Sequence, residues 1–458
     1  PGDIVSKKYK TTMRSIGIDL GTTSIKGAVL NLDTRALEHV TRQPFPDRVA
    51  GLPRLHYEVD PQAVVDATRD VLEALLAHAP DCQSITLCSQ MHGVVLTDAA
   101  GKALSNVITW QDQRAMAPGP QSGQTWFEAL KARLAPDDLR QVGNDLWVMR
   151  PASVLFWMAQ NGQLPPGARF CALPDYVTAQ LCGAPVATDY GHAAASAFFN
   201  FDTGDWHHEM LGRLGLDGLG LPRVAGRDEV IAEYRHAARA IPFHPPMADQ
   251  QCSLYGAGLN PGELSVNVST GSQVAMLNDG PVYGDFQTRP YYDGQYLLTC
   301  IHVPAGRSLN ALVRLLTELA VAEGVTLQRV WENIEAMTGQ TADTDLQVDL
   351  SFFAGALGNE GAITHIREDN LSAGALFRAA FDHMAANYWM LAQRISPERR
   401  WARLVFSGGL VLQMPVLREL ILRRFACDYR TAEGGEDSLM GIMRDCARRA
   451  GLRPASSP

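Results

Sequence analysis

Two short turns in the sequence combine glycine with small hydroxyl residues, a composition that suits phosphate binding. The first is Gly-Thr-Thr-Ser at residues 21–24, and the second is Ser-Thr-Gly-Ser at residues 269–272. Such turns present backbone N–H groups and hydroxyls with no bulky side chain in the way. Together they could hold one triphosphate from both sides, whereas each motif alone is also typical of an ordinary hairpin turn.

Asp19 lies just before the first turn and changes its chemistry. A carboxylate beside bound phosphate is unfavourable unless a cation lies between them, so Asp19 predicts a Mg²⁺ site reached through water. The alternative is that Asp19 only caps the turn. A third segment, Gly408-Gly409, separates an apolar strand from an apolar helix. Adjacent glycines there would let a flat group such as adenine approach the backbone, and a simple strand-to-helix turn is the alternative.

The elements that must position these residues are predicted from the apolar pattern. Each hydroxyl-rich turn lies between two apolar runs, which predicts a strand–turn–strand hairpin. Asp60-Pro61 predicts the start of a helix, and residues 84–90, 93–98 and 106–112 predict further strands. Because the hairpin returns about 250 residues after its first occurrence, the pattern favours a duplicated α/β domain.

Proline-rich sequence ending at residues 242–246 predicts a domain boundary near residue 245. The expected domains are therefore residues 13–245 and residues 246–451. Residues 1–12 are polar and precede Met13, so they are interpreted as a remnant added for expression or as a loose tail.

Composition excludes several classes of protein. The 458 residues are 46% hydrophobic and carry a formal net charge of −9, which disfavours a nucleic-acid-binding protein. No apolar run is long enough to span a membrane, and no secretory leader is evident, so we expect a cytoplasmic protein with no membrane partner. The cysteines contain no CxxC pair and are expected to be buried free thiols: Cys82, Cys88, Cys171, Cys182, Cys252, Cys300, Cys427 and Cys446.

Seven segments, taken in order, resemble the FGGY carbohydrate kinases. They are DLGTTS, SQMHG, TWQDQR, DYGHAAAS, MADQQCSLYGAG, NVSTGSQ and SGGLVLQMP, and the similarity spans residue 13 to about residue 445. The resemblance implies an α/β protein with two ribonuclease H-like, actin-like ATPase domains. It further implies that ATP and a sugar meet in a cleft between the domains, with Mg²⁺ as the metal.

The resemblance also implies roles for single residues. Asp249 corresponds to the catalytic base that accepts the proton of the attacking sugar hydroxyl, although it could also cap the helix that starts at Gln250. Asp19 is the second catalytic candidate, through Mg²⁺. The positions implied to bind the sugar are Gln90, Met91, His92, Trp110, Asp112 and Gln250.

The nucleotide positions follow from the same resemblance. The implied ATP-binding residues are Gly21, Thr22, Thr23, Ser24, Thr270, Gly271, Gly306, Asn310, Gly409 and Gln413. One departure lies next to the catalytic residue, where the family usually has glycine and this chain has Ala248. That difference concerns backbone packing and leaves the chemistry unaffected.

The sequence leaves the substrate open among ketoses. Sedoheptulose is slightly preferred over D-xylulose, because residues 90–96, 107–114 and 174–183 read closer to sedoheptulokinase, and glycerol is disfavoured because SQMHG occupies the place of a charged pair. An actin-like or heat-shock-like ATPase module is the rival class, and a silent sugar-binding relative is another. A homodimer is compatible with the sequence, which does not determine the oligomeric state.

Overall fold

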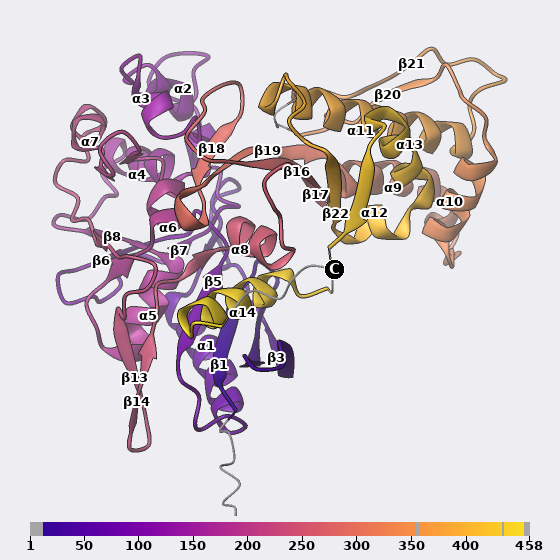
Figure 1. The fold of residues 1–458 in the computed structure, drawn as a ribbon. Helices are drawn as coiled ribbons and strands as arrows, with labels where there is room; N and C mark the ends of the chain where they lie inside the picture. Colours follow the sequence, from indigo (N-terminus) through magenta and orange to yellow (C-terminus); the bar gives the residue numbers. More distant parts are fainter. Residues whose placement is uncertain (1–11, 354, 356, 433–434, 453–458) are drawn as a thin grey trace, which may run out of the picture. The chain divides into compact units, whose positions relative to one another are not determined.

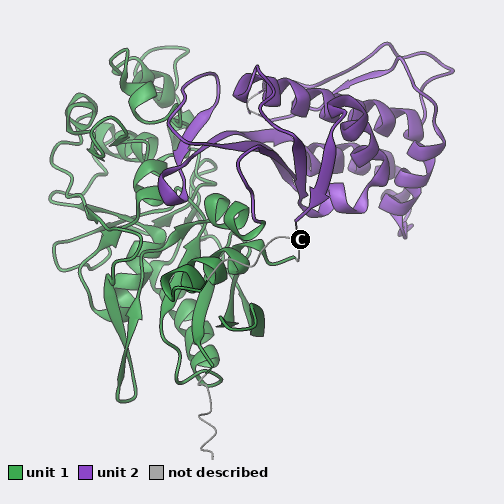
Figure 2. Cartoon of the chain, in the orientation of Figure 1, with its two compact units in different colours: residues 1–257, 435–458 green, residues 258–434 purple. Residues whose placement is uncertain are grey.

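The computed structural model describes residues 12–353, 355, 357–432 and 435–452, with helices and strands mixed along the chain (Figure 1). The chain divides into two compact units, coloured separately in Figure 2: unit 1 holds residues 1–257 and 435–458, and unit 2 holds residues 258–434. Each unit is an α/β domain built around one main sheet. Within the described residues, no helix combines the length and apolarity that crossing a membrane requires.

The main sheet of unit 1 starts with the predicted hairpin. Its strands are β1 (Arg14–Leu20), β2 (Ser24–Asn31), β3 (Ala36–Pro44), β5 (Ile85–Ser89), β13 (Ala232–His236), β14 (Arg239–Phe243) and β15 (Met247–Ala248). β1, β2 and β3 form an antiparallel meander, while β5 is parallel to β1 and β15 is parallel to β5. β1 contacts both α1 and α14, which explains why its apolar residues are buried throughout.

The helices of unit 1 are α1 (Pro61–Leu76), α2 (Trp126–Lys131), α3 (Asp138–Gln141), α4 (Pro151–Gln160), α5 (Leu173–Cys182), α6 (Tyr190–Ala195), α7 (His208–Leu214), α8 (Asp249–Gly256) and α14 (Asp437–Arg449). A second sheet in this unit contains β4 (Glu58–Val59), β7 (Val107–Ile108), β6 (Val94–Thr97) and β8 (Arg169–Ala172). The predicted helix start is confirmed, because the Asp60 side chain accepts from the N–H groups of Gln62 at 2.7 Å and Ala63 at 3.2 Å.

The main sheet of unit 2 is built in the same way. Its strands, in spatial order, are β18 (Gln287–Pro290), β19 (Tyr296–Pro304), β17 (Gly271–Asn278), β16 (Glu263–Val268), β22 (Arg403–Ser407) and β23 (Asp428–Thr431). A small sheet pairs β20 (Gln347–Asp349) with β21 (Ala362–Thr364). The helices are α9 (Gly306–Ala322), α10 (Val330–Gln340), α11 (Ala373–Ile395), α12 (Gly409–Gln413) and α13 (Pro415–Phe425).

The two main sheets share one strand order, which supports the duplication inferred from the sequence. In unit 1 the order β3-β2-β1-β5-β15 joins three antiparallel strands to two parallel ones. In unit 2 the order β19-β17-β16-β22-β23 has the same directions. Both hydroxyl-rich turns therefore lie at the end of the central strand of their sheet, beside the end of the neighbouring parallel strand.

The division between the units differs from the expected boundary at residue 245. β15 and α8 belong to unit 1, because β15 adds a parallel strand to β5, and α14 returns to unit 1 by packing on α8. Glycines make this helix contact close: a Cβ on Gly256 would come within 1.8 Å of the Asp437 carbonyl, and one on Gly441 within 2.1 Å of the Cys252 carbonyl. Sequence breakers alone could not indicate that these segments complete the first domain.

Two smaller expectations also have definite outcomes. The apolar helix predicted after the strand and Gly408-Gly409 is present as α12, but it does not continue through the segment, because Pro415 starts a second helix, α13. The eight cysteines are free thiols, as expected. Six of them are buried, while Cys182 and Cys427 are half-buried.

Candidate active site

The two predicted catalytic carboxylates lie at the carboxyl ends of two parallel strands of unit 1, β1 and β15, which flank β5. Asp19 of β1 lies opposite Cys88 of β5, and Cys88 lies opposite Met247 of β15. Asp249 comes two residues after Met247, as the first residue of α8. Burial raises the pKa of the Cys88 thiol well above its usual value, and Cys252, Asp19 and Asp249 raise it further. One buried thiol is thus influenced by both carboxylates, which places them in the same region of the unit.

Asp249 is half-buried at the start of α8. One of its carboxylate oxygens accepts a hydrogen bond from the Gln250 N–H at 2.8 Å, and the Gln250 residue is only 8% exposed. The N-cap position itself belongs to Ala248. Asp249 is therefore the first residue of the helix and does not occupy the cap position that the alternative predicted, and it remains partly open to solvent.

Asp19 is 6% exposed and lies in a network of charged and hydroxyl groups. Its Oδ2 accepts a hydrogen bond from the Ser438 hydroxyl at 2.5 Å and lies 3.3 Å from Lys26 Nζ. Lys26 also pairs with Glu436 at 2.9 Å. Burial alone would lower the pKa of Lys26, but the two carboxylates raise it above its ordinary value, so the amine stays protonated.

Asp19 and Asp437 are the acidic residues of this region that could bind a hydrated Mg²⁺ ion. Asp437, beside the Ser438 that contacts Asp19, has one buried carboxylate oxygen without a hydrogen-bond partner among the described residues. Burial, with Glu436 adding to it, raises the pKa of Asp437 to about 6. Carboxylate oxygens supplemented by water are the ligands that Mg²⁺ prefers, so Asp19 and Asp437 are the residues that would hold it.

The first turn, residues 21–24, is tight and is tied to two other predicted site residues. The Gly21 N–H donates to the Ser24 carbonyl at 3.0 Å, and a Cβ on Gly21 would lie only 2.9 Å from that oxygen. The Trp110 indole N–H donates to the Thr22 hydroxyl at 3.0 Å. The Gln90 side chain donates to the Gly21 carbonyl at 3.2 Å. The structure therefore brings together residues that the sequence assigned separately to phosphate and to sugar.

The segment after β5 is held in an unusual backbone conformation. His92 has φ +70°, a region rarely adopted by residues other than glycine. Its Nδ1 lies 3.1 Å from the Ala195 carbonyl, and its Nε2 contacts the guanidinium of Arg150. Arg150 is fully buried and also pairs with Asp145. A buried arginine that holds the His92 ring was not indicated by any local sequence signal.

Asp112, predicted to read sugar hydroxyls, is completely buried. Arg114 donates to its two oxygens at 2.9 and 2.8 Å, and the Tyr57 N–H donates to it at 2.8 Å. The same guanidinium pairs with Glu58 at 2.5 Å. In this geometry Asp112 holds buried loops together and has no exposed oxygen for a substrate hydroxyl.

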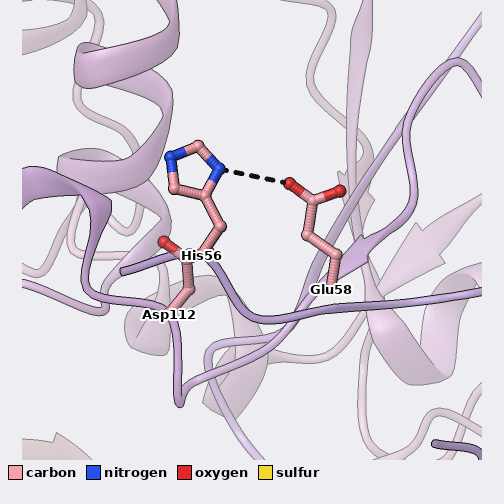
Figure 3. Close-up of side chains that lie close together, drawn as sticks. All are labelled: His56, Glu58 and Asp112. Atoms are coloured by element: carbon pink, nitrogen blue, oxygen red, sulfur yellow. Dashed lines mark ion pairs between the residues drawn. The ribbon is translucent and has the colours of Figure 1, made fainter. Parts of the chain in front are cut away.

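His56, Glu58 and Asp112 lie close enough together to resemble a set of metal ligands within the described residues (Figure 3). His56 Nδ1 is 3.8 Å from a Glu58 oxygen. Arg114 already supplies a positive charge to both carboxylates, and the pKa of His56 is lowered by burial and then by Arg114. The group is therefore a partly buried ion-pair network. Asp19 is likewise paired with a cation, Lys26, so the assignment of Asp19 to Mg²⁺ stays a prediction from the family resemblance.

The second turn brings together the predicted nucleotide residues of unit 2. Thr270 and Gly271 are exposed, as is Thr23 in the first turn. The Gly306 N–H donates to the Ser269 carbonyl at 3.1 Å, and a Cβ on Gly306 would come within 2.7 Å of that oxygen. Glycine at the start of α9 is thus required by its contact with the turn.

The glycine pair after β22 lies beside the same turn. Gly408 has φ +89°, and a Cβ there would come within 2.4 Å of the Val268 carbonyl. Gly409 is exposed, and a Cβ on it would meet open space. Asn310, one turn into α9, and Gln413, at the end of α12, are also exposed. Gly408 therefore allows the chain to pack closely against the Val268 carbonyl, while Gly409 leaves its own backbone exposed to solvent.

Some site residues were not predicted. Lys26 could have been found, because the hairpin register places it directly opposite Asp19. Ser438 and Arg150 lie far along the chain from their partners Asp19 and His92, so only the folded sheet and helices bring them into contact.

Comparison with known proteins identifies the fold class first. A xylulose kinase structure from Lactobacillus acidophilus matches 97% of this chain and 90% of its own, with a TM-score of 0.84 and 18% sequence identity. At this identity the match describes the fold alone: two actin-like ATPase domains, in agreement with the duplicated sheets.

The family follows from the sequence comparisons. The N-terminal domain model of the FGGY family of carbohydrate kinases matches residues 14–256, so this chain belongs to that family. A glycerol kinase of Saccharolobus islandicus is 26% identical over 276 residues, which cover 58% of this chain and 54% of the relative. The chain thus spans about half the length of that relative. Sedoheptulokinase of Mus musculus is 25% identical over 463 residues, covering 90% of this chain and 92% of the relative.

Proposed function

We propose that this protein transfers the γ-phosphoryl group of ATP to a hydroxyl of a sugar. The observation that carries the proposal is that Asp19, near the end of β1, and Asp249, just after β15, lie at the same edge of one sheet, with β5 between the two strands and a hydroxyl-rich turn following β1. The family match over residues 14–256 supports the same reaction class.

In the proposed reaction Asp249 acts as general base. Its carboxylate accepts the proton of the sugar hydroxyl while the hydroxyl oxygen forms a bond to the γ-phosphorus, and the bond from that phosphorus to the bridging oxygen of ADP breaks. The partial exposure of Asp249 suits this role, because the base must reach a bound hydroxyl. Asp19, Lys26 and Glu436 then supply a fixed charge pattern beside the first turn.

We infer that each unit contributes its own candidate residues for the nucleotide. Thr22, Thr23, Thr270 and Gly271 offer hydroxyls and N–H groups for phosphate oxygens. Gly306, Asn310, Gly409 and Gln413 are the candidates for the adenosine side, supported by the exposed Gly409 backbone next to the second turn. Mg²⁺ held at Asp19 and Asp437 would supply positive charge to the β- and γ-phosphate oxygens.

For the acceptor we propose a ketose phosphorylated at its terminal primary hydroxyl, with sedoheptulose ahead of D-xylulose and both ahead of glycerol. The similarity to sedoheptulokinase over 90% of this chain supports the first choice. The glycerol kinase similarity, confined to 58% of the chain, makes glycerol the necessary competitor in any assay. His92 and Trp110 are the residues expected to contact the sugar.

A coupled assay of ADP release tests the proposal with sedoheptulose, D-xylulose, D-ribulose and glycerol at equal concentrations. We expect sugar-dependent ADP release with the highest kcat/KM for sedoheptulose, because polar pocket groups left unpaired by a three-carbon polyol cost ~1–3 kcal/mol each. Sugar-independent ATP hydrolysis alone would instead indicate an ATPase module. A glycerol kcat/KM equal to that of the best ketose would refute the substrate assignment and leave the kinase assignment intact.

Cytoplasmic location and the lack of a nucleic-acid partner remain predictions from the sequence. The oligomeric state is open, and a homodimer is the assembly to test first, by light scattering of the purified chain.

A further inference from the structure

The start of α6 lies unusually close to the residue that precedes Asp249. A Cβ built on Gly191 would lie 3.1 Å from the Cβ of Ala248 and 3.8 Å from the Gln251 side-chain nitrogen. The first of these distances is shorter than an ordinary contact between methyl groups. α6 also contacts β15, the strand that ends at Ala248. Gly191 is therefore the residue that allows an alanine, in place of the glycine usual in the family, at position 248.

Gly191 itself is held in place by the cap of its helix. Asp189 accepts hydrogen bonds from the N–H groups of Gly191 at 2.7 Å and His192 at 3.1 Å. The same carboxylate lies 2.5 Å from His192 Nδ1, and His192 is only 2% exposed. Burial alone would lower the pKa of His192, but Asp189, with smaller contributions from Asp175 and Asp249, raises it. A cap with three contacts to one carboxylate leaves little freedom at Gly191.

The methyl group of Ala248 is enclosed from its other sides as well. It belongs to a small buried cluster with Met91 and Ala195, the residue at the end of α6. The Ala195 carbonyl lies 3.1 Å from His92 Nδ1. One six-residue helix thus contacts both the residue before Asp249 and the segment that carries His92.

We propose that α6 is the positioning element of Asp249, acting through the contact between Gly191 and Ala248. The fixed Asp189 cap sets the place of Gly191, Gly191 sets the place of Ala248, and Ala248 sets the direction in which Asp249 leaves β15. The inference rests on the proposed function, because Asp249 acts as a base only if the protein is a kinase. A shift of about 1 Å in a catalytic group lowers turnover far more than it lowers ligand binding.

The test is a double-mutant cycle of Gly191→Ala and Ala248→Gly, with Gly212→Ala as the matched control. Gly212 lies in α7 of the same unit, and a Cβ there would meet open space. We expect Gly191→Ala to lower kcat by about tenfold or more with the KM for ATP unchanged, and the control to behave as wild type. The kcat of the double variant should be at least about threefold higher than that of Gly191→Ala, because removing the Ala248 methyl group makes room for the new Cβ.

The cycle also separates the contact with Ala248 from a simple distortion of the cap. A Cβ on Gly191 would lie 2.8 Å from an Asp189 carboxylate oxygen, and Ala248→Gly cannot relieve that contact. If the kcat of the double variant, relative to wild type, is no higher than the product of the relative kcat values of the two single variants, the proposal is refuted. A kcat of Gly191→Ala equal to that of Gly212→Ala would refute it as well.

Hydrogen–deuterium exchange of the peptide covering residues 247–252 gives a readout that does not depend on turnover. We expect faster exchange of this peptide in Gly191→Ala than in Gly212→Ala, and a return toward wild type in the double variant. If the wild type phosphorylates no sugar but the exchange follows this pattern, the proposed function fails and the positioning contact stands. If sugar phosphorylation is present but exchange in residues 247–252 is unchanged, the positioning inference fails alone.

Discussion

The same hairpin occurs once in each unit, but only the copy in unit 1 has a charged pair beside its turn. In unit 1, Asp19 lies one residue before the end of β1, opposite Lys26 of β2. In unit 2, Asn267 lies one residue before the end of β16, opposite Gln273 of β17. The neighbouring parallel strand adds Cys88 in unit 1 and Ser407 in unit 2. An acid–base pair in one unit thus corresponds to two neutral amides in the other.

The difference shows what each hairpin can hold. A buried carboxylate is costly unless a cation compensates it, and in unit 1 Lys26 and the Ser438 hydroxyl supply that compensation. In unit 2 the Asn267 side chain donates to the Ser407 hydroxyl at 2.9 Å and needs no counter-charge. The duplicated sheet therefore offers a neutral cradle in unit 2 and a charged site in unit 1. The following variants test whether that asymmetry matters.

The largest effect is expected for Asp249→Asn, which removes the proposed base from the charged unit. The amide keeps the shape of the side chain but cannot accept the proton, so kcat should fall by ~10²–10⁴-fold while ATP binding persists. Steady-state kinetics and isothermal titration with ATP measure the two properties. Asp70→Asn, the same change on an exposed part of α1, is the control and should be silent. More than about a tenth of the wild-type kcat in Asp249→Asn would contradict the role of base.

Asp19→Asn converts the acid of unit 1 into the residue found at the same place in unit 2. We expect kcat to fall by about 10–100-fold and the Mg²⁺ concentration for half-maximal rate to rise, because the group that holds the metal loses its charge. A Mg²⁺ titration of the reaction rate measures this. The reverse change, Asn267→Asp, should leave the Mg²⁺ dependence unaltered. An unchanged Mg²⁺ titration in Asp19→Asn would show that Asp19 serves only the turn.

Lys26→Gln removes the cation from the pair and leaves the buried Asp19 carboxylate with the Ser438 hydroxyl but without a counter-charge. We expect the free energy of unfolding to fall by about 1–3 kcal/mol and kcat/KM for ATP to fall about tenfold. The double variant Asp19→Asn/Lys26→Gln has the same Asn and Gln pair as unit 2. Its free energy of unfolding should therefore return toward the wild-type value, while its kcat stays low. Urea denaturation of the three variants checks the order. A double variant less stable than Lys26→Gln would refute the equivalence of the two hairpins.

The smallest effect on turnover is expected for two buried carboxylates away from the hydroxyl-rich turns, whose contributions to stability should instead show opposite pH dependences. Burial raises the pKa of Asp175 in unit 1 from 3.8 to about 7. Because the pKa of Asp175 is higher in the folded state than in the unfolded state, its contribution to the free energy of unfolding is most favourable below about pH 4. That contribution is lost as the pH rises to 7. The free energy of unfolding of Asp175→Asn, relative to that of the wild type, should therefore increase by about 2–3 kcal/mol from pH 5 to pH 8.

Glu263 in unit 2 is the matched contrast. Burial alone would raise its pKa, but Arg430 and Arg403 lower it, at distances of 2.6 and 2.7 Å. Its stabilising contribution is present above the unfolded pKa and is lost as the pH falls, so the penalty of Glu263→Gln should be largest near pH 7 and shrink toward pH 4. Denaturation curves at pH 4, 5, 6, 7 and 8 measure both variants. Parallel pH slopes for the two variants would contradict the assigned environments.

Local sequence was enough to predict the parts of the fold that depend on local physics. The two hairpins follow from apolar runs around a short hydroxyl-rich turn, and α1 follows from the Asp60-Pro61 start. The placement of Asp19 before the first turn is also a sequence property. Its pairing with Lys26 was within reach, because the register of a hairpin is fixed by its turn.

The wrong or incomplete predictions concern contacts between segments far apart in the chain. Asp112 reads as a polar pocket residue in the sequence, yet Arg114 and Tyr57 bury it completely. The boundary at residue 245 follows the prolines, yet β15 and α8 complete the first sheet. Neither outcome has a local signal, because burial and strand pairing depend on what the rest of the chain places nearby.

By itself, the sequence determined the α/β class, the repeated hairpin, and the residue types that make a kinase of the FGGY family recognisable. Only the tertiary structure decided which of those residues meet: it placed Met247 beside Cys88 and thereby Asp249 at the same sheet edge as Asp19, it brought Ser438 back to Asp19, and it set Gly191 against Ala248. The physical reason is that residue type and turn geometry act within a few positions of the chain, whereas strand order and helix packing decide the neighbours of a buried charge.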